Sequence, residues 1–201
     1  KLIDEGSLGQ KAKRGVYKKV GKEIHVLDVA THTYKLSEGK ADDAVKDILR
    51  ERDWAKKLAA LRDSKHPQAQ FLWSLLRDTF HYCAHHLASI ADNARDLDLA
   101  VRWGFGWDSG PFEIWQAAGW QQVASWISAD VAADMAMASA PLPAWAADPG
   151  RTGVHTAHGS YAPLGNIYQP RSTLPVYRRQ LFPDRLLGET VQYGETFFET
   201  A

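Results

Sequence analysis

The fold class is decided by residues 67–91, which read PQAQFLWSLLRDTFHYCAHHLASIA. Apolar residues recur at spacings of three and four along this run, at Phe71, Leu72, Leu75, Leu76, Phe80, Cys83, Leu87, Ile90 and Ala91. Such spacing over this length predicts one long α-helix, and Pro67 suits its first turn. Because the apolar stripe is broad, we expect the helix to be buried against more than one neighbour.

Shorter elements are predicted on both sides of this helix. Upstream, two β-prone runs at 23–27 and 33–36 predict a small ribbon, and helical spacing follows over 42–50 and 54–61. Downstream, we expect a helix over 97–103 that is capped by Asp96 and ended by Gly104. Two further helices are expected, one from Pro111 to Gly119 and one from Trp120 to about Met137. The sequence thus predicts a mainly α fold with a small β ribbon near the N-terminus.

The composition is that of a folded protein. Of the 201 residues, 45% are hydrophobic and 24% are charged, and 24 Lys and Arg balance 24 Asp and Glu. This balance argues against wholesale disorder and against a protein that coats nucleic acid. A single cysteine excludes an internal disulfide and a CxxC redox or zinc motif. No apolar run approaches the roughly 20 residues of a membrane-spanning helix, so we expect a cytoplasmic protein without membrane or nucleic-acid partners.

The balanced charge hides an asymmetry along the chain. Residues 1–66 carry 16 Lys and Arg against 11 Asp and Glu, whereas residues 67–150 carry 3 against 9. Seven of the nine prolines lie between Pro141 and Pro183. These shifts predict a basic N-terminal segment, an apolar helical core and an extended C-terminal arm.

Two histidines invite a metal-binding hypothesis. His81 and His85 are four residues apart on one helical face, a spacing at which two imidazoles can share a metal ion. The metalloprotease pattern, however, requires a glutamate where Tyr82 stands. The more conservative interpretation is a polar helix edge in which Arg77, His81 and His85 face solvent or a partner.

Other candidate motifs have a structural interpretation. The glycines from Gly104 to Gly110 are spaced GxGxxxG and follow a helix rather than a strand, so they do not match a dinucleotide loop. A turn that uses positive φ angles and close backbone approach, with Phe105, Trp107 and Phe112 packed around it, explains them better. Cys83 lies on the apolar stripe, where a thiol is inert.

A basic loop runs from Lys11 to Lys19 and could contact an anionic ligand such as a nucleotide phosphate. Its candidate ligand-binding residues are Lys11, Lys13 and Arg14. Spacing alone identifies no catalytic, cofactor-binding or metal-binding residue.

The segment 96–113, DLDLAVRWGFGWDSGPFE, closely resembles a signature of the C-terminal domain of 3-hydroxyacyl-CoA dehydrogenases. In that family an Asp-Ile-Asp helix leads into a Gly-Phe-Gly turn and then Gly-Pro-Phe. The matching residues here are Asp96, Asp98, Gly104, Phe105, Gly106, Gly110, Pro111 and Phe112. Residues 8–17 also resemble the Gly-Arg-Lys-Thr-Gly-Lys-Gly-Phe-Tyr run that ends such a domain, with Lys13 where the family has glycine and Val16 where it has phenylalanine.

The order of these motifs resembles the tandem arrangement of long bacterial β-oxidation proteins. It implies the end of a first C-terminal-type repeat at 1–22 and a ribbon and helical connector at 23–64. A second helical C-terminal-type domain would occupy 65–140. Residues 141–201 would be an extended arm that leads to a following domain, such as an enoyl-CoA hydratase module.

The resemblance implies that the intact protein oxidises L-3-hydroxyacyl-CoA with NAD, using a catalytic His–Glu pair in a Rossmann domain that none of the 201 residues match. This chain, which opens with Lys1 rather than Met, would be a piece of that protein. It would supply helical scaffold, part of a dimer or interdomain surface and a wall of the acyl-CoA site, without bound NAD and without activity alone. Two alternatives stay open. The first is an interaction scaffold that joins dehydrogenase and hydratase modules, which is motivated by five tryptophans (Trp103, Trp107, Trp115, Trp120, Trp126). The second is a helical metal-binding protein that uses His81 and His85.

Overall fold

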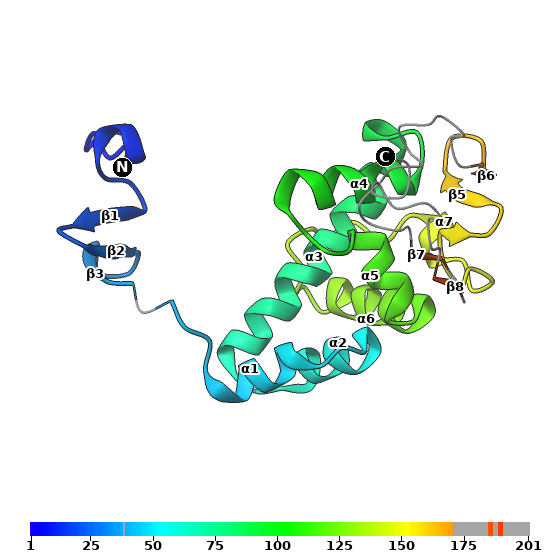
Figure 1. Cartoon of the computed structure of the whole chain (residues 1–201), viewed down its shortest axis with the longest axis horizontal. Coiled ribbons are helices and arrows are strands. Elements are labelled where there is room, and N and C mark those ends of the chain that lie inside the picture. The colour runs from blue at the N-terminus through cyan, green and yellow to red at the C-terminus, as the bar shows by residue number, and fades with distance from the viewer. Residues whose placement is uncertain (38, 171–184, 187–188, 191–201) are drawn as a thin grey trace, which may run out of the picture. The chain divides into compact units, whose positions relative to one another are not determined.

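The computed structural model describes residues 1–37, 39–170, 185–186 and 189–190. Contacts between Cα atoms divide the chain into two compact units, Lys1–Asp42 and Asp43–Ala201 (Figure 1). The boundary falls inside the expected 23–64 connector. The domain boundaries expected from the resemblance stay predictions.

The first unit is a small antiparallel sheet preceded by two turns. The strands β1 (Tyr17–Val20), β2 (Glu23–Asp28) and β3 (Thr33–Leu36) pair in sequence order. The ribbon predicted from β2 and β3 is therefore confirmed, whereas β1 was not predicted, because lysines hide its strand pattern. The stretch before Gly6 closes as a helical turn: the Ser7 N–H donates to Leu2 O and the Gly6 N–H to Ile3 O, with Gly6 at φ +69°.

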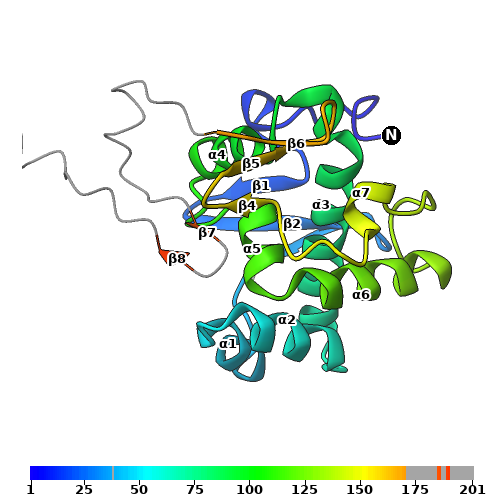
Figure 2. The same ribbon diagram turned by 90° about the vertical axis from the view of Figure 1, so that its right-hand side faces the viewer.

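The second unit is mainly helical. Its helices are α1 (Asp43–Arg50), α2 (Trp54–Asp63), α3 (Pro67–Ile90), α4 (Ala94–Phe105), α5 (Pro111–Ala117), α6 (Trp120–Ala132) and α7 (Ala144–Ala147). The long helix α3 packs against α2, α4 and α5 (Figures 1 and 2). The mainly α fold predicted from the sequence is confirmed, and none of the described helices is long and apolar enough to cross a membrane.

Aromatic rings fill the centre of this unit. Trp115 and Trp120 stack with ring centroids 4.1 Å apart and an interplanar angle of 4°. Their indole N–H groups are satisfied, since Trp115 donates to Trp120 O and Trp120 donates to Ala146 O, both at 2.9 Å. Phe80 of α3 stacks on Trp115, as does Phe112 from the same helix as Trp115, α5. Trp115 and Trp120 therefore belong to the hydrophobic core, and their contacts hold α5, α6 and α7 together.

The region after Pro141 contains more regular structure than its sequence predicted. The strands β4 (His155–Thr156), β5 (Gly159–Ala162) and β6 (Ile167–Gln169) form an antiparallel sheet whose strand β5 packs against α4 (Figure 2). Farther along, β7 (Arg185–Leu186) pairs with β8 (Glu189–Thr190). All of β5 is buried. Residues 171–184, 187–188 and 191–201 of the expected arm lie outside the described residues.

Two helices, α4 and α6, differ from their predicted bounds. Helix α4 starts three residues early because the Asn93 side chain, rather than Asp96, accepts hydrogen bonds from the Arg95 and Asp96 N–H groups. It ends past Gly104, with Gly106 as a left-handed cap at φ +68°. Helix α6 ends at Ala132 instead of Met137. Two residues after this end, Asp134 adopts a positive φ of 58°.

The long helix buries only part of its apolar surface within the described residues. Phe80 and Leu87 are fully buried, but four large side chains along one face stay exposed: Phe71, Leu75, Tyr82 and Ile90. The prediction that a polar edge of this helix faces solvent or a partner is wrong for Arg77 and His81, which are both 3% exposed. Arg77 lies inside because Asp78 and Asp130 pair with its guanidinium at 3.0 Å.

Candidate functional site

The signature segment is organised by a carboxylate that caps a helix distant in sequence. Asp98, in α4, is 1% exposed and accepts hydrogen bonds from the Phe112 and Glu113 N–H groups at 2.9 and 3.0 Å. These are two of the free donors in the first turn of α5, which Gly110 precedes without a side chain of its own. Asp98 therefore performs the capping role that a local Ser or Asp usually has.

Gly110 makes this arrangement sterically possible. A Cβ placed on Gly110 would lie 2.3 Å from Asp98 Cβ, far inside van der Waals contact. Glu113 then reaches back and accepts a hydrogen bond from the Gly110 N–H at 2.7 Å, while its other oxygen pairs with Arg102 Nη1 at 3.0 Å. The close approach expected of a glycine in this turn thus occurs at Gly110.

The same carboxylate joins the helices to the C-terminal sheet. Asp98 Oδ2 accepts a 2.7 Å hydrogen bond from His155 Nε2, and His155 Nδ1 lies 2.9 Å from the Ser160 hydroxyl. A carboxylate only accepts, so Nε2 carries the proton and, in the neutral ring, Nδ1 accepts from Ser160. His155 and Ser160 were not predicted as site residues, although the short β-prone run after Gly159 was a signal for ordered structure there.

Gln116 fixes the backbone beside His155. Its side-chain oxygen accepts from the Val154 and His155 N–H groups at 2.7 and 2.9 Å, and its amide donates to His155 O at 3.0 Å. A Cβ on Gly153 would lie 2.0 Å from the Gln116 oxygen. We refer below to Asp98, Arg102, Glu113, Gln116, His155 and Ser160 as the buried polar cluster.

The buried polar cluster is built for positioning rather than for reaction. The series Ser160–His155–Asp98 has the residue types of a hydrolase triad, but the three residues are only 5%, 4% and 1% exposed. A substrate has no access to a hydroxyl in that setting. Burial, together with the nearby Asp98 charge, raises the pKa of Glu113, which is the mark of a carboxyl group packed away from water.

The remaining signature residues divide between core and surface. Phe112 is fully buried and Pro111 occupies the first turn of α5. Phe105 is 77% exposed and does not pack around the turn as expected, because it lies in the last turn of α4 on its outer side. Cys83 is buried as expected, and burial raises the pKa of its thiol to about 12, which leaves it unreactive.

The glycine turn does not suit a dinucleotide. The N-terminal amides of α5 already bind Asp98 and Glu113, so a pyrophosphate at that helix end would meet two buried carboxylates. The described residues therefore do not form an NAD site at this position.

The two candidate metal ligands are engaged by backbone carbonyls. His81 Nε2 lies 2.8 Å from Ala140 O and His85 Nε2 lies 2.7 Å from Pro141 O, so each ring donates its Nε2 proton. Over the described ranges, no group of three or more His, Cys, Asp or Glu side chains is placed to hold a metal ion. The pair holds the chain after α6 against α3.

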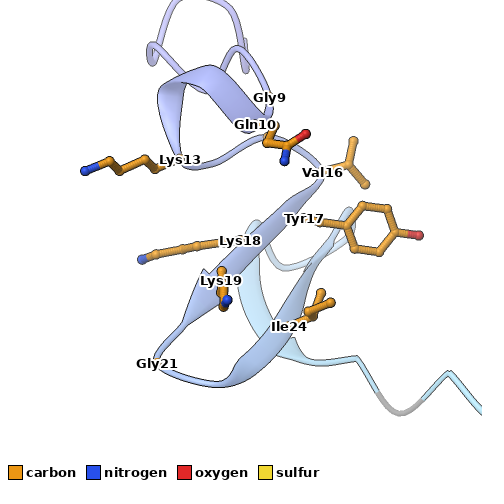
Figure 3. A pocket seen from close by; sticks show the side chains of 10 residues that line it. Gly9, Gln10, Lys13, Val16, Tyr17, Lys18, Lys19, Gly21 and Ile24 are labelled. Carbon is orange, nitrogen blue, oxygen red and sulfur yellow. The ribbon is translucent and has the colours of Figure 1, made fainter.

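The basic loop of the first unit borders an open groove. Within it, η1 (Gln10–Ala12) carries Lys11, and Lys13 follows in the left-handed region with φ 61°. Arg14 Nη2 donates to Glu5 O at 2.6 Å, so this side chain points back to the N-terminal turn. The groove, of about 740 Å³, is lined by Gly9, Gln10, Lys13, Gly15, Val16, Tyr17, Lys18, Lys19, Gly21 and Ile24 (Figure 3). Of the three predicted ligand residues, the structure places Lys13 at this groove, together with Lys18 and Lys19.

Comparison with known proteins gives one informative match. Over 123 residues the chain is 37% identical to a "Probable 3-hydroxyacyl-CoA dehydrogenase" of Bacillus subtilis (strain 168). The match covers 61% of this chain, which spans about a sixth (16%) of the length of that curated relative. No family model and no solved structure matches the chain. This similarity supports a relationship to a dehydrogenase.

Proposed function

We propose that this chain is part of the C-terminal, substrate-binding and dimerisation portion of an NAD-dependent L-3-hydroxyacyl-CoA dehydrogenase of fatty-acid β-oxidation. The observation that carries the proposal is the 37% identity to a protein named "Probable 3-hydroxyacyl-CoA dehydrogenase". The structure supports a positioning role, since the conspicuous polar residues of the second unit are buried.

In this proposal the chain does not perform the chemistry. NAD, the catalytic residues and the reacting end of the acyl-CoA would be held by an N-terminal NAD-binding domain of the same protein. The described residues would supply a rigid helical body, whose α4–α5 turn and C-terminal sheet are locked by the buried polar cluster. An enoyl-CoA hydratase domain and a second copy of the chain are proposed partners.

The experiment uses the polypeptide of the whole open reading frame that contains this sequence. That polypeptide should oxidise NADH when acetoacetyl-CoA is added, as followed at 340 nm. A purified, folded polypeptide that leaves NADH unchanged would contradict the proposal.

A second candidate function is an interaction scaffold that joins catalytic modules. The exposed side chains Phe71, Leu75, Tyr82 and Ile90 on one face of α3 favour it, because large exposed apolar faces mark interaction sites. Calorimetry with acetoacetyl-CoA discriminates the two functions: binding to the isolated chain favours a substrate-binding portion, and its absence favours a scaffold.

A further inference from the structure

One face of α3 stays apolar and exposed along about three turns of the helix. Phe71, Leu75 and Tyr82 are 65%, 49% and 53% exposed, and they are separated by four and seven residues. This is the spacing at which the side chains of one helix meet a second helix laid along it. From Phe71 to Tyr82 the stripe is about 16 Å long, at 1.5 Å of rise per residue. Its spacing and length therefore suit a partner helix.

Both methionines of the chain lie beside this stripe. The Met135 carbonyl accepts a hydrogen bond from Arg77 Nη2 at 2.7 Å, and the Met137 N–H donates to Asp78 Oδ1 at 3.2 Å. These bonds, with those of the two histidines to the carbonyls that follow, hold segment 135–141 alongside α3. The two side chains are 59% and 78% exposed, and flexible thioethers adapt readily to the surface of a partner. We refer to Phe71, Leu75, Tyr82, Met135 and Met137 as the α3 apolar face.

The exposed charge of this part of the chain is of one sign. The range 67–150, which the structure describes throughout, contains three cations and nine acids. All three cations are buried, as are three of the acids, so the interior is balanced and the other six acids are left nearer the surface. The cations are Arg77, Arg95 and Arg102, and the buried acids are Asp98, Glu113 and Asp130. Residues 67–150 therefore expose acidic side chains but no Lys or Arg.

Two of these acids border the α3 apolar face. Asp134 is exposed and directly precedes Met135, and Asp78 is partly exposed next to Met137. A contact between two identical copies of the face would bring these acids toward those of the other copy, without an exposed cation of residues 67–150 between them. A membrane surface rich in anionic lipids would be repelled in the same way. A helix that carries Lys or Arg beside its apolar side chains would be attracted.

We infer that the α3 apolar face binds a basic amphipathic helix of a protein partner. The apolar side chains of that helix pack on Phe71, Leu75, Tyr82 and the two methionines, while its Lys or Arg side chains face Asp78 and Asp134. The inference rests on the second candidate function, the interaction scaffold, and gives a chemistry to its partner. It does not require dehydrogenase activity.

Two synthetic peptides test the inference. Each has three heptads with Leu at the a and d positions, and the other positions carry Lys and Ala in one peptide and Glu and Ala in the other. Fluorescence anisotropy should show that the 201-residue chain binds the Lys peptide, and binds the Glu peptide about tenfold more weakly or less. Affinity for the Lys peptide should also fall about tenfold between 50 and 500 mM NaCl, because salt screens exposed charges. Equal binding of the two peptides, or no binding of either, would overturn the inference.

Three variants locate the site. Leu75→Glu on α3 and Met137→Glu on the neighbouring segment should each raise the Kd for the Lys peptide about tenfold, because a charge is placed against the leucines of the peptide. Both variants add a negative charge, so attraction by charge alone would tighten binding instead. Leu164→Glu makes the same change at an 80% exposed residue between β5 and β6, and should change the Kd less than about twofold. Equal effects of Leu75→Glu and Leu164→Glu, or tighter binding by Leu75→Glu, would overturn the site.

Folding and self-association are measured on the same proteins. Because the substituted side chains are exposed, the urea midpoints should match that of the wild type, and Met137→Glu, which lies outside the helix, decides if Leu75→Glu does not fold. Sedimentation should give the same mass for the wild type and Leu75→Glu. A wild-type dimer that becomes a monomer in Leu75→Glu would place a second copy on this face and overturn the inference.

Failure of this inference and failure of the proposed dehydrogenase are distinguishable. The peptide measurements contain neither NADH nor acyl-CoA. A whole polypeptide that leaves NADH unchanged therefore disproves the dehydrogenase alone, and a chain that binds neither peptide disproves the basic partner helix alone.

Discussion

Asp98 Oδ2 and His155 Nε2 form a 2.7 Å hydrogen bond that connects α4 to β4 across 57 residues of chain, and both side chains are buried. The same carboxylate caps α5, so one side chain holds three elements together. We therefore expect the folding of the second unit to be especially sensitive to substitution of Asp98.

Asp98→Asn should destabilise the second unit by about 3 kcal/mol, because the amide nitrogen must face at least one buried N–H donor. Urea unfolding followed by tryptophan fluorescence measures this loss. Asp96→Asn, on the exposed side of the same helix turn, is the control and should cost less than about 0.5 kcal/mol. Equal losses for the two variants would show that Asp98 does not have the structural role described.

Glycine-to-alanine substitutions at two signature positions should have opposite effects. Gly110→Ala forces a Cβ to within 2.3 Å of Asp98 Cβ and should cost about 3 kcal/mol. Gly104→Ala meets no atom within 4 Å and lies in α4, so it should stabilise the protein by about 0.5–1 kcal/mol. Thermal unfolding distinguishes the two signs, and a stabilising Gly110→Ala would contradict the close contact.

Gln116→Leu should loosen the C-terminal sheet from α5 without unfolding the helices. It removes three hydrogen bonds to Val154 and His155 while keeping the volume of the side chain similar. Hydrogen exchange of residues 153–169 should become faster, whereas exchange in α3 should not change. The exposed Gln122→Leu serves as the matched variant, and protection of 153–169 that is identical in both variants would refute the role of Gln116.

His81 should make stability depend on pH. Burial lowers the pKa of His81 below its ordinary value of 6.5, so the unfolded chain takes up the proton first as the pH falls. The stability present above pH 6.5 is therefore lost as the pH drops below it. In His81→Gln, whose amide can still donate to Ala140 O, the unfolding free energy should fall less between pH 7.5 and 5.5 than in the wild type. His85→Gln is the exposed control, and a pH dependence that is the same in the wild type and His81→Gln would contradict the prediction.

The helices were predictable because their signals are local. Apolar spacing and Pro67 marked α3, and Pro111 marked the start of α5. The start of α4 was misplaced because both Asn93 and Asp96 can cap a helix, and only the folded geometry shows which side chain accepts the hydrogen bonds.

The buried polar cluster was only half predictable. Asp98 belongs to a recognisable segment, but its partner His155 lies in a proline-rich region without periodicity. Nothing local indicates that a histidine there is 4% exposed, because its burial depends on a strand pairing and a helix contact made over long range. For the same reason Arg77 was misread as exposed, since its buried partner Asp130 lies 53 residues away.

The central proposal is that this chain supports the dehydrogenase structurally and does not itself catalyse the reaction. The most direct measurement compares NADH oxidation by the isolated 201-residue chain and by the whole polypeptide, at equal molar concentration with acetoacetyl-CoA. The account predicts steady oxidation by the whole polypeptide and none by the chain. Steady, enzyme-dependent NADH consumption by the chain alone would contradict it.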